Sequence, residues 1–312
     1  MRSDNSIPRP QGGPLAWRER ALPCLVHPAT IRTLGNFLAF LNVAATNQGI
    51  SLRLMTRCDG DALTEYDSLL AMGEKLVGLR AIPGNRVRWI NWSVLVPIRG
   101  LFYCSVRGYL WMLRKRRRFL QNYPAFRSVY DFYPSHARAM QSRWPSLQVT
   151  PFPIGLYAEP PQGTVGACVS YDFDVCAVGA RSSRRDLVCA ALEGAGLLLS
   201  PRQGPFEELI RRSRLVLNVH QHRCDNCEAH RILSAYAQGR VVVSEHIVGL
   251  DECLDPRWVI TANVRELPAV ICELLQNPER LEILGKQAFE YYWQEFWPYA
   301  LKWWENTLGA LS

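Results

Sequence analysis

The chain has 312 residues, of which 48% are hydrophobic and 21% are charged. These fractions are typical of a globular protein with a sizeable core, and they exclude an intrinsically disordered chain. The net charge of +8 favours an anionic partner, such as a phosphate compound, a nucleic acid or an acidic membrane surface.

Three further features bear on membrane insertion, export and redox state. The longest apolar region, 89–113, is interrupted by Pro97, Arg99 and Arg107, whereas a membrane-spanning helix needs about 20 consecutive apolar residues. Residues 1–20 are polar and proline-rich, so we expect a loose leader instead of a secretory signal. The ten cysteines lack the spacing of a disulfide framework, which favours reduced thiols in a cytoplasmic protein.

The N-terminal half begins with the pattern of a βαβ unit. Its strand, helix and strand are expected over 21–26, 29–49 and 50–56. This order predicts the opening of a parallel sheet. The later elements of this half are expected to be a helix near 66–79, a strand around 87–92, a helix near 100–121, and a strand followed by a helix after Pro134.

The C-terminal half follows a segment rich in proline and glycine, 151–163, which we expect to be a hinge. The expected strands are 171–180, 197–200, 214–220 and 240–245, the intervening helices are 184–196, 205–213 and 227–239, and terminal helices lie within 265–297. The strands are apolar without a two-residue period, as in a parallel sheet covered on both faces. We therefore predict two doubly wound α/β domains, over 21–150 and 164–290.

The stretch 218–239 contains three histidines and two cysteines that could bind zinc. They are His220, His222, Cys224, Cys227 and His230. No second paired motif lies nearby to complete a tetrahedral site, so we predict no metal. The stretch follows an expected strand, where doubly wound domains bind ligands, and Asp225 with Glu228 has the spacing of a capping box.

Two blocks of this half, RRSRLVLNVH and CEAHRILSAYAQGRVVVSE, resemble the C-terminal domain of GT-B glycosyltransferases, in particular the spore-maturation-protein-like group. The resemblance implies two Rossmann-like domains with a cleft between them and a final helix, 291–312, that crosses back to the N-terminal domain. It also implies transfer of a sugar from a nucleotide-diphosphate sugar to a hydroxyl acceptor, whether a glycan, a lipid-linked molecule or a small molecule, without a required cofactor. Tyr236 stands where the retaining pattern has its second glutamate, eight residues after Glu228, which leaves the stereochemistry open.

The same resemblance implies that the donor binds at the strand ends of the C-terminal domain. Glu228 would bind the ribose hydroxyls, and arginines would neutralise the diphosphate. The complete set of expected donor-binding residues is Gly179, Arg181, Arg184, Arg185, Asn218, His220, Glu228, Arg231, Ser244 and Glu245. A solvent-exposed arginine run is the alternative for the three arginines within 181–185.

Transfer to a hydroxyl acceptor needs a general base, which we expect from the N-terminal domain. His27, directly after the first strand, is the best placed, and Asp131 and His136 come next. Asp59 and Asp61 come last. A structural role is the alternative for each of these residues.

A basic run lies beside aromatic residues in the expected helix near 100–121. It consists of Arg114, Lys115, Arg116, Arg117 and Arg118. The default interpretation of this run is a solvated helix end. The alternatives are peripheral contact with the inner face of an anionic membrane and contact with nucleic-acid phosphates. Two other functions stay open: a glycosyltransferase acting on a modified nucleic-acid base, and a non-catalytic basic nucleic-acid-binding protein with a Cys/His zinc loop.

Overall fold

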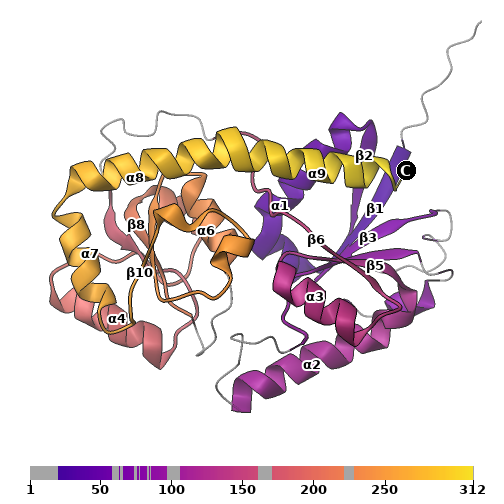
Figure 1. The fold of residues 1–312 in the computed structure, drawn as a ribbon, viewed down its shortest axis with the longest axis horizontal. Coiled ribbons are helices and arrows are strands. Elements are labelled where there is room, and N and C mark those ends of the chain that lie inside the picture. The colour runs from indigo at the N-terminus through magenta and orange to yellow at the C-terminus, as the bar shows by residue number, and fades with distance from the viewer. Residues whose placement is uncertain are drawn as a thin grey trace, which may run out of the picture.

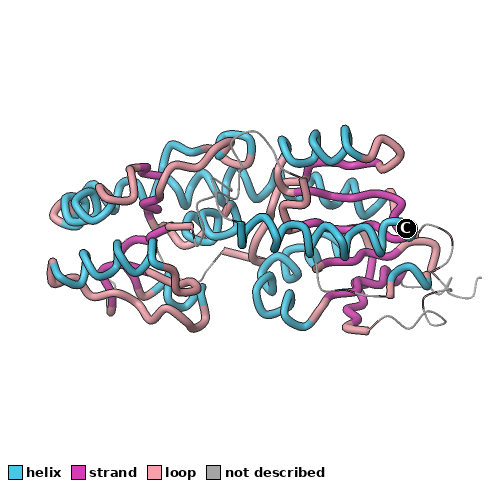
Figure 2. Tube along the Cα trace, turned by 90° about the horizontal axis from the view of Figure 1, so that it is seen from below, coloured by secondary structure: helices cyan, strands magenta, loops and turns pink. Residues whose placement is uncertain are grey.

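Two parallel sheets form two α/β domains that lie side by side (Figure 1). The computed structural model describes residues 20–57, 63, 66–73, 76, 78–82, 84, 86–96, 106–160, 171–220 and 228–311. Figure 2 shows the same two halves from below. The predicted fold class is therefore confirmed.

The N-terminal domain contains a six-stranded sheet in the order β2-β1-β3-β4-β5-β6, with every pairing parallel. Its strands are β1 (Arg20–Val26), β2 (Ile50–Met55), β3 (Leu69–Met72), β4 (Val87–Asn91), β5 (Phe126–Asp131) and β6 (Gln148–Pro151). Its helices are α1 (Pro28–Asn47), α2 (Val106–Asn122) and α3 (Pro134–Arg143), with the short 3-10 turns Leu79–Ala81 and Tyr123–Ala125.

The helix expected near 66–79 is wrong, because β3 occupies that region. All four residues of β3 are buried, since the strand lies in the middle of the sheet between β1 and β4. A short apolar run of this kind is compatible with a buried strand or a buried helix turn, and its pattern does not distinguish them.

The C-terminal domain contains a four-stranded parallel sheet in the order β10-β9-β8-β7. Its strands are β7 (Phe173–Cys176), β8 (Ser213–Asn218), β9 (Val241–Ser244) and β10 (Val259–Thr261). Its helices are α4 (Ser183–Gly194), α5 (Phe206–Arg211), α6 (Ala229–Tyr236) and α7 (Leu267–Leu275), with 3-10 turns at Leu250–Glu252 and Pro256–Trp258.

Two expectations for this domain differ from the structure. The strand expected at 197–200 is reduced to one isolated bridge, between Val175 and Leu199. Glu228 is itself the N-cap of α6 and its side chain makes no capping bond, so the expected capping box is wrong.

A long terminal rod runs along both domains (Figure 1). It consists of α8 (Pro278–Glu290), a π-helical turn (Tyr291–Phe296) and α9 (Trp297–Gly309). Trp304 of α9 packs edge-on against Phe37 of α1, with ring centroids 5.7 Å apart. The Tyr292 hydroxyl bonds to both the N–H and the carbonyl of Leu156, in the segment between the domains. The rod therefore binds the connecting segment and the N-terminal domain together.

Across the described part of the chain, no helix combines the length and the apolar character needed to cross a bilayer.

Candidate active site

A cavity of about 420 Å³ opens between the two domains. One wall is formed by the first turns of α1, and the other by the starts of α5 and α6 with the residues after β7. The described lining residues are Arg32, Thr33, Leu34, Asn36, Phe37, Leu156, Val178, Gly204, Pro205, Phe206, Glu207, His230, Arg231 and Ser234. Segments that follow parallel strands from both sheets meet here, which is where doubly wound domains bind ligands.

A partly buried ionic cluster lies at this cavity. Glu228 pairs with Arg231, with 2.8 Å between Oε2 and Nε, and lies 3.8 Å from Nη2 of Arg185. Burial opposes ionisation of Glu228, but the charges of Arg231, His220 and Arg185 outweigh it and lower its pKa to about 2. Burial and then the charge of Arg231 lower the pKa of Arg185. Two guanidinium groups thus share one carboxylate, and a bound anion would relieve their repulsion.

Arg185 joins the turn after β7 to the end of β8. Its Nε donates to the Val219 carbonyl at 2.6 Å, and its Nη1 donates to the Ala180 carbonyl at 3.0 Å. Gly179 leaves the space that this guanidinium fills, because a Cβ there would lie 2.4 Å from Nη1. The contacts of these two predicted donor residues are therefore structural.

The ends of β8 and β9 are joined by five more of the predicted donor residues. Glu245 accepts from the backbone N–H of His220 at 2.5 Å and pairs with Arg184. The Asn218 amide donates to the Ser244 hydroxyl at 3.0 Å. Asn218, His220, Ser244 and Glu245 are buried, so these side chains hold the strand ends together next to the cavity.

Arg231 is the one predicted donor residue among the cavity-lining residues that the structure describes. Its guanidinium lies over the ring of Phe206, 5.4 Å from the centroid, and its Nη1 donates to the Val178 carbonyl at 2.6 Å. Arg181, in contrast, is exposed and pairs with Asp186 at 3.6 Å. The solvated alternative therefore describes Arg181 best.

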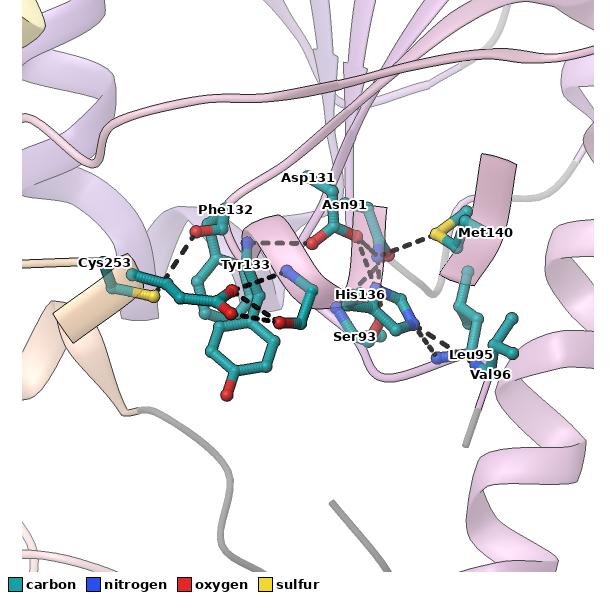
Figure 3. A network of polar contacts seen from close by, with 12 residues as sticks. Asn91, Ser93, Leu95, Val96, Asp131, Phe132, Tyr133, His136, Met140 and Cys253 are labelled. Carbon is teal, nitrogen blue, oxygen red and sulfur yellow. Dashed lines mark hydrogen bonds and ion pairs between the residues drawn. The ribbon is translucent and has the colours of Figure 1, made fainter. Parts of the chain in front are cut away.

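Two of the predicted bases, Asp131 and His136, belong to a buried network (Figure 3). Oδ2 of Asp131 accepts from Nδ2 of Asn91 at 2.6 Å and from Nδ1 of His136 at 2.7 Å. Nε2 of His136 accepts the backbone N–H groups of Leu95 and Val96, at 2.9 and 3.2 Å. We infer a neutral ring with its proton on Nδ1, because Nε2 serves as an acceptor. The pair thereby fixes the chain that follows β4.

His27 is the N-cap of α1, where its Nδ1 accepts the backbone N–H of Ala29 at 3.1 Å. A neutral ring then carries its proton on Nε2, which makes that nitrogen a donor and not a proton acceptor. The three base assignments stay predictions that no contact among the described residues supports. Asp59 and Asp61 lie outside those residues.

Two residues that the sequence analysis does not single out, Asn36 and Glu207, line the cavity, and a third, Tyr157, contacts one of them. Nδ2 of Asn36 donates to Oε1 of Glu207 at 2.7 Å, which joins α1 to α5 across the domain boundary. The Asn36 carbonyl accepts the N–H of Tyr157 at 3.0 Å, and Tyr157 has a φ of 65°. The sequence around Glu207 indicates only a helix that begins with two carboxylates, so it carries no signal of a cavity.

The histidine and cysteine stretch is described only at its ends. His222, Cys224 and Cys227 lie outside the described residues. Within the described ranges, no group of His, Cys, Asp or Glu side chains could hold a metal ion. The absence of a metal therefore stays a prediction.

The sequence of the C-terminal wall of the cavity is similar to that of a known protein family. Residues 202–298 match the family described as glycosyl transferase-like, a range that includes α5, α6 and Arg231. The glycosyltransferase prediction agrees with this match. No curated protein matches the chain by sequence.

Several solved structures share the fold over nearly the whole chain. HepE of Anabaena, in complex with UDP-glucose, has a TM-score of 0.62 and 13% identity, covering 93% of this chain and 100% of that one. Sucrose-phosphate synthase from Thermosynechococcus elongatus has a TM-score of 0.57 and 12% identity, covering 94% and 100%. A mutant of T4 phage BGT, in complex with UDP-glucose, has a TM-score of 0.55 and 11% identity, covering 93% and 98%. The predicted GT-B fold is confirmed, and the spore-maturation-protein-like grouping stays a prediction.

Proposed function

We propose that this chain of GT-B fold is a glycosyltransferase that moves a sugar from a nucleotide-diphosphate sugar to a hydroxyl acceptor. The observation that carries the proposal is the interdomain cavity, whose C-terminal wall presents Arg231, one of two guanidinium groups that share the single carboxylate of Glu228. The glycosyl transferase-like match covers most of that wall. HepE and T4 phage BGT, which share the fold, have structures in complex with UDP-glucose.

The chemistry requires neutralisation of the diphosphate as it leaves the sugar. The polar contacts of Arg231 use Nε and Nη1, and we propose that its Nη2 donates to a phosphate oxygen. Arg32 lines the cavity from α1 and would add a second cation from the other domain. Guanidinium groups bind phosphate oxygens in a bidentate manner, so we propose a reaction that needs no metal cofactor.

The test is a thermal-unfolding panel with UDP, GDP, dTDP and CMP, each with and without a chelator. We expect one nucleotide to raise the Tm by several degrees, because a ligand at about 100 times its Kd adds roughly 2.7 kcal/mol of stability. Arg231→Met should remove most of that rise, whereas Arg257→Met should keep it, because Arg257 is exposed and pairs with Asp255. The chelator should change neither result.

Two outcomes would contradict the proposal in different ways. If no nucleotide raises the Tm of the wild-type protein, but the chelator unfolds it, the transferase proposal is overturned in favour of a protein with a zinc-binding loop. A full response in the Arg231 variant would move the donor away from this wall. No observation among the described residues favours the modified-base acceptor or the non-catalytic alternative.

We also propose that α2 makes peripheral contact with an anionic membrane, at its cytoplasmic face. Arg114, Arg117 and Arg118 are exposed, and so are Tyr109 and Trp111, so the helix presents cations together with aromatic rings. Lys115 does not contribute to this surface. It is buried, with its Nζ 3.3 Å from Oγ of Ser93.

A further inference from the structure

Glu207 is the one carboxylate among the described residues that line the interdomain cavity. It is the second residue of α5, directly after Phe206. Its Oε1 accepts the amide of Asn36 at 2.7 Å, and the structure shows no hydrogen bond to Oε2 within the described ranges. Glu207 is half-buried, so a ligand in the cavity can reach a carboxylate that is already oriented by the opposite domain.

Glu228, which the family resemblance implies as the residue that binds the ribose hydroxyls, has different surroundings from Glu207. It is not among the lining residues that the structure describes, and its carboxylate lies between Arg231 and Arg185. Its pKa of about 2 reflects this enclosure by cations, which outweighs its burial. A carboxylate that compensates one buried and one partly buried guanidinium group is costly to withdraw from them.

The surroundings of Glu207 favour hydroxyl groups as ligands. Burial, and then the charge of Glu207, raise the pKa of Tyr157 to about 12, so this phenol stays protonated. The hydroxyl of Tyr157 is hydrogen-bonded to Ser234 of α6, which lines the cavity. A carboxylate oxygen that shares a cavity wall with a serine hydroxyl is suited to bind the vicinal hydroxyls of a sugar ring.

The position of Arg231 indicates which sugar ring this is. Its guanidinium lies over the ring of Phe206, the residue before Glu207. A phosphate bound by Arg231 would therefore lie in the same cavity as the carboxylate of Glu207. In a nucleotide-diphosphate sugar the ribose is bonded directly to the first phosphate.

We propose that Glu207, and not Glu228, binds the ribose hydroxyls of the donor. This inference rests on the proposed function, because it presumes that a ribonucleoside diphosphate occupies the cavity. Asn36 acts as a positioning residue, since it holds Oε1 from the N-terminal domain. Donor recognition thereby depends on the two domains being in contact.

The test measures affinity for the ribonucleoside diphosphate that binds best among UDP, GDP and ADP, and for its 2′-deoxy and 3′-deoxy forms. Wild-type protein should bind at least one deoxy form roughly 10- to 100-fold more weakly, as expected for the loss of a hydrogen bond to a charged group. Glu207→Gln keeps the shape and the acceptor for Asn36. This variant should bind the ribonucleoside diphosphate roughly 10- to 100-fold more weakly than wild-type protein does. It should also bind the ribonucleoside diphosphate and the deoxy forms with nearly equal affinity.

Two further variants separate this role from a general electrostatic effect. Glu208→Gln removes the adjacent carboxylate, which is exposed and pairs with Arg212, and should behave as wild type. Glu228→Gln should lower the Tm of the free protein but keep the discrimination against the deoxy forms.

The contradicting results are distinct. If Glu207→Gln discriminates as well as wild type, or loses affinity only for the sugar-bearing donor, the ribose assignment is overturned while the transferase proposal stands. If wild-type protein binds no nucleoside diphosphate, both proposals are overturned.

Discussion

Gly179 and Arg185 depend on each other, because the absence of a side chain at one leaves room for the guanidinium of the other. The φ of Gly179 is 143°, in a region that only glycine adopts readily. Arg185 uses the space to donate to carbonyls from two different loops. One backbone position therefore controls how the strand ends beside the cavity are held.

We expect Gly179→Ala to lower the free energy of unfolding by about 3 kcal/mol or more. Backbone strain of roughly 1–3 kcal/mol adds to the cost of a buried guanidinium that loses its partners. Gly196→Ala is the matched control, because Gly196 has a φ of 81° but open space around it, and we expect a loss of about 1–2 kcal/mol there. Urea unfolding measures both, and equal losses would show that the Gly179–Arg185 contact contributes nothing.

At this scale the sequence predicts the places of residues better than their roles. Asn218 and Ser244 are identified because the carboxyl ends of parallel strands meet at one edge of a sheet. Their bond to each other joins residues 26 positions apart, which no local pattern reports. Asp131 and His136 likewise carry the residue types of a base, but their partners show the pair fixing a loop. Glu207 is missed because only the assembled fold places Asn36 opposite it.

At the scale of elements, the length of the hydrophobic pattern decides what the sequence predicts. The helix expected over 29–49 corresponds to α1 at Pro28–Asn47, because its apolar spacing continues for several turns. The four residues of β3 are too few for a period to be recognised. The segment 197–200 is apolar and lies beside β7, where the N–H of Ser200 donates to the carbonyl of Val175, but its pairing with β7 amounts to one isolated bridge and not a ladder.

Helix α2 carries the prediction of membrane contact. We expect Arg114→Gln, Arg117→Gln and Arg118→Gln together to weaken binding to vesicles of anionic and zwitterionic lipid by roughly 100-fold, at about 1 kcal/mol for each basic residue near the surface. Co-sedimentation measures the effect, and purely zwitterionic vesicles should bind neither protein.

A triple substitution in the C-terminal domain controls for net charge. Arg265→Gln, Arg280→Gln and Lys286→Gln change the charge equally on exposed positions of the other domain. An equal loss of vesicle binding in this control would show that α2 is not the contact. Binding of duplex DNA that depends on α2 and falls steeply with salt would assign the surface to nucleic acid instead.

At the scale of the whole molecule, the domains also touch at a second place, on the side of α3. Glu252, in the turn after β9, accepts the backbone N–H of Ser135 at 2.8 Å and pairs with Nη2 of Arg138 at 2.9 Å. Ser135 and Arg138 belong to the first turns of α3, so a carboxylate of one domain caps a helix of the other. If the chain is the proposed transferase, its cleft has to open to release the product, and this contact would oppose that step.

The contact of Glu252 has a defined pH dependence. Partial burial opposes its ionisation, but hydrogen bonds from Ser135 and the charge of Arg138 outweigh it and hold its pKa below the usual 4.5. The stabilisation from such a carboxylate is complete above the pKa of the unfolded chain and is lost as the pH falls through the lowered pKa of the folded chain. The domain contact should therefore be constant from neutral pH to about pH 5 and should weaken only at lower pH.

Hydrogen exchange at the Ser135 amide tests this contact directly. We expect Glu252→Ala to reduce the protection of that amide by roughly 10- to 100-fold at pH 7, and to make the protection independent of pH. Wild-type protein should show the same loss only below its lowered pKa, because protonation removes the charge that the α3 N-terminus and Arg138 bind. Glu282→Ala, on the exposed face of α8, should leave the amide protected. An unchanged Ser135 amide in the Glu252 variant would mean that packing elsewhere, such as the rod and the Asn36–Glu207 bond, is what holds the domains together.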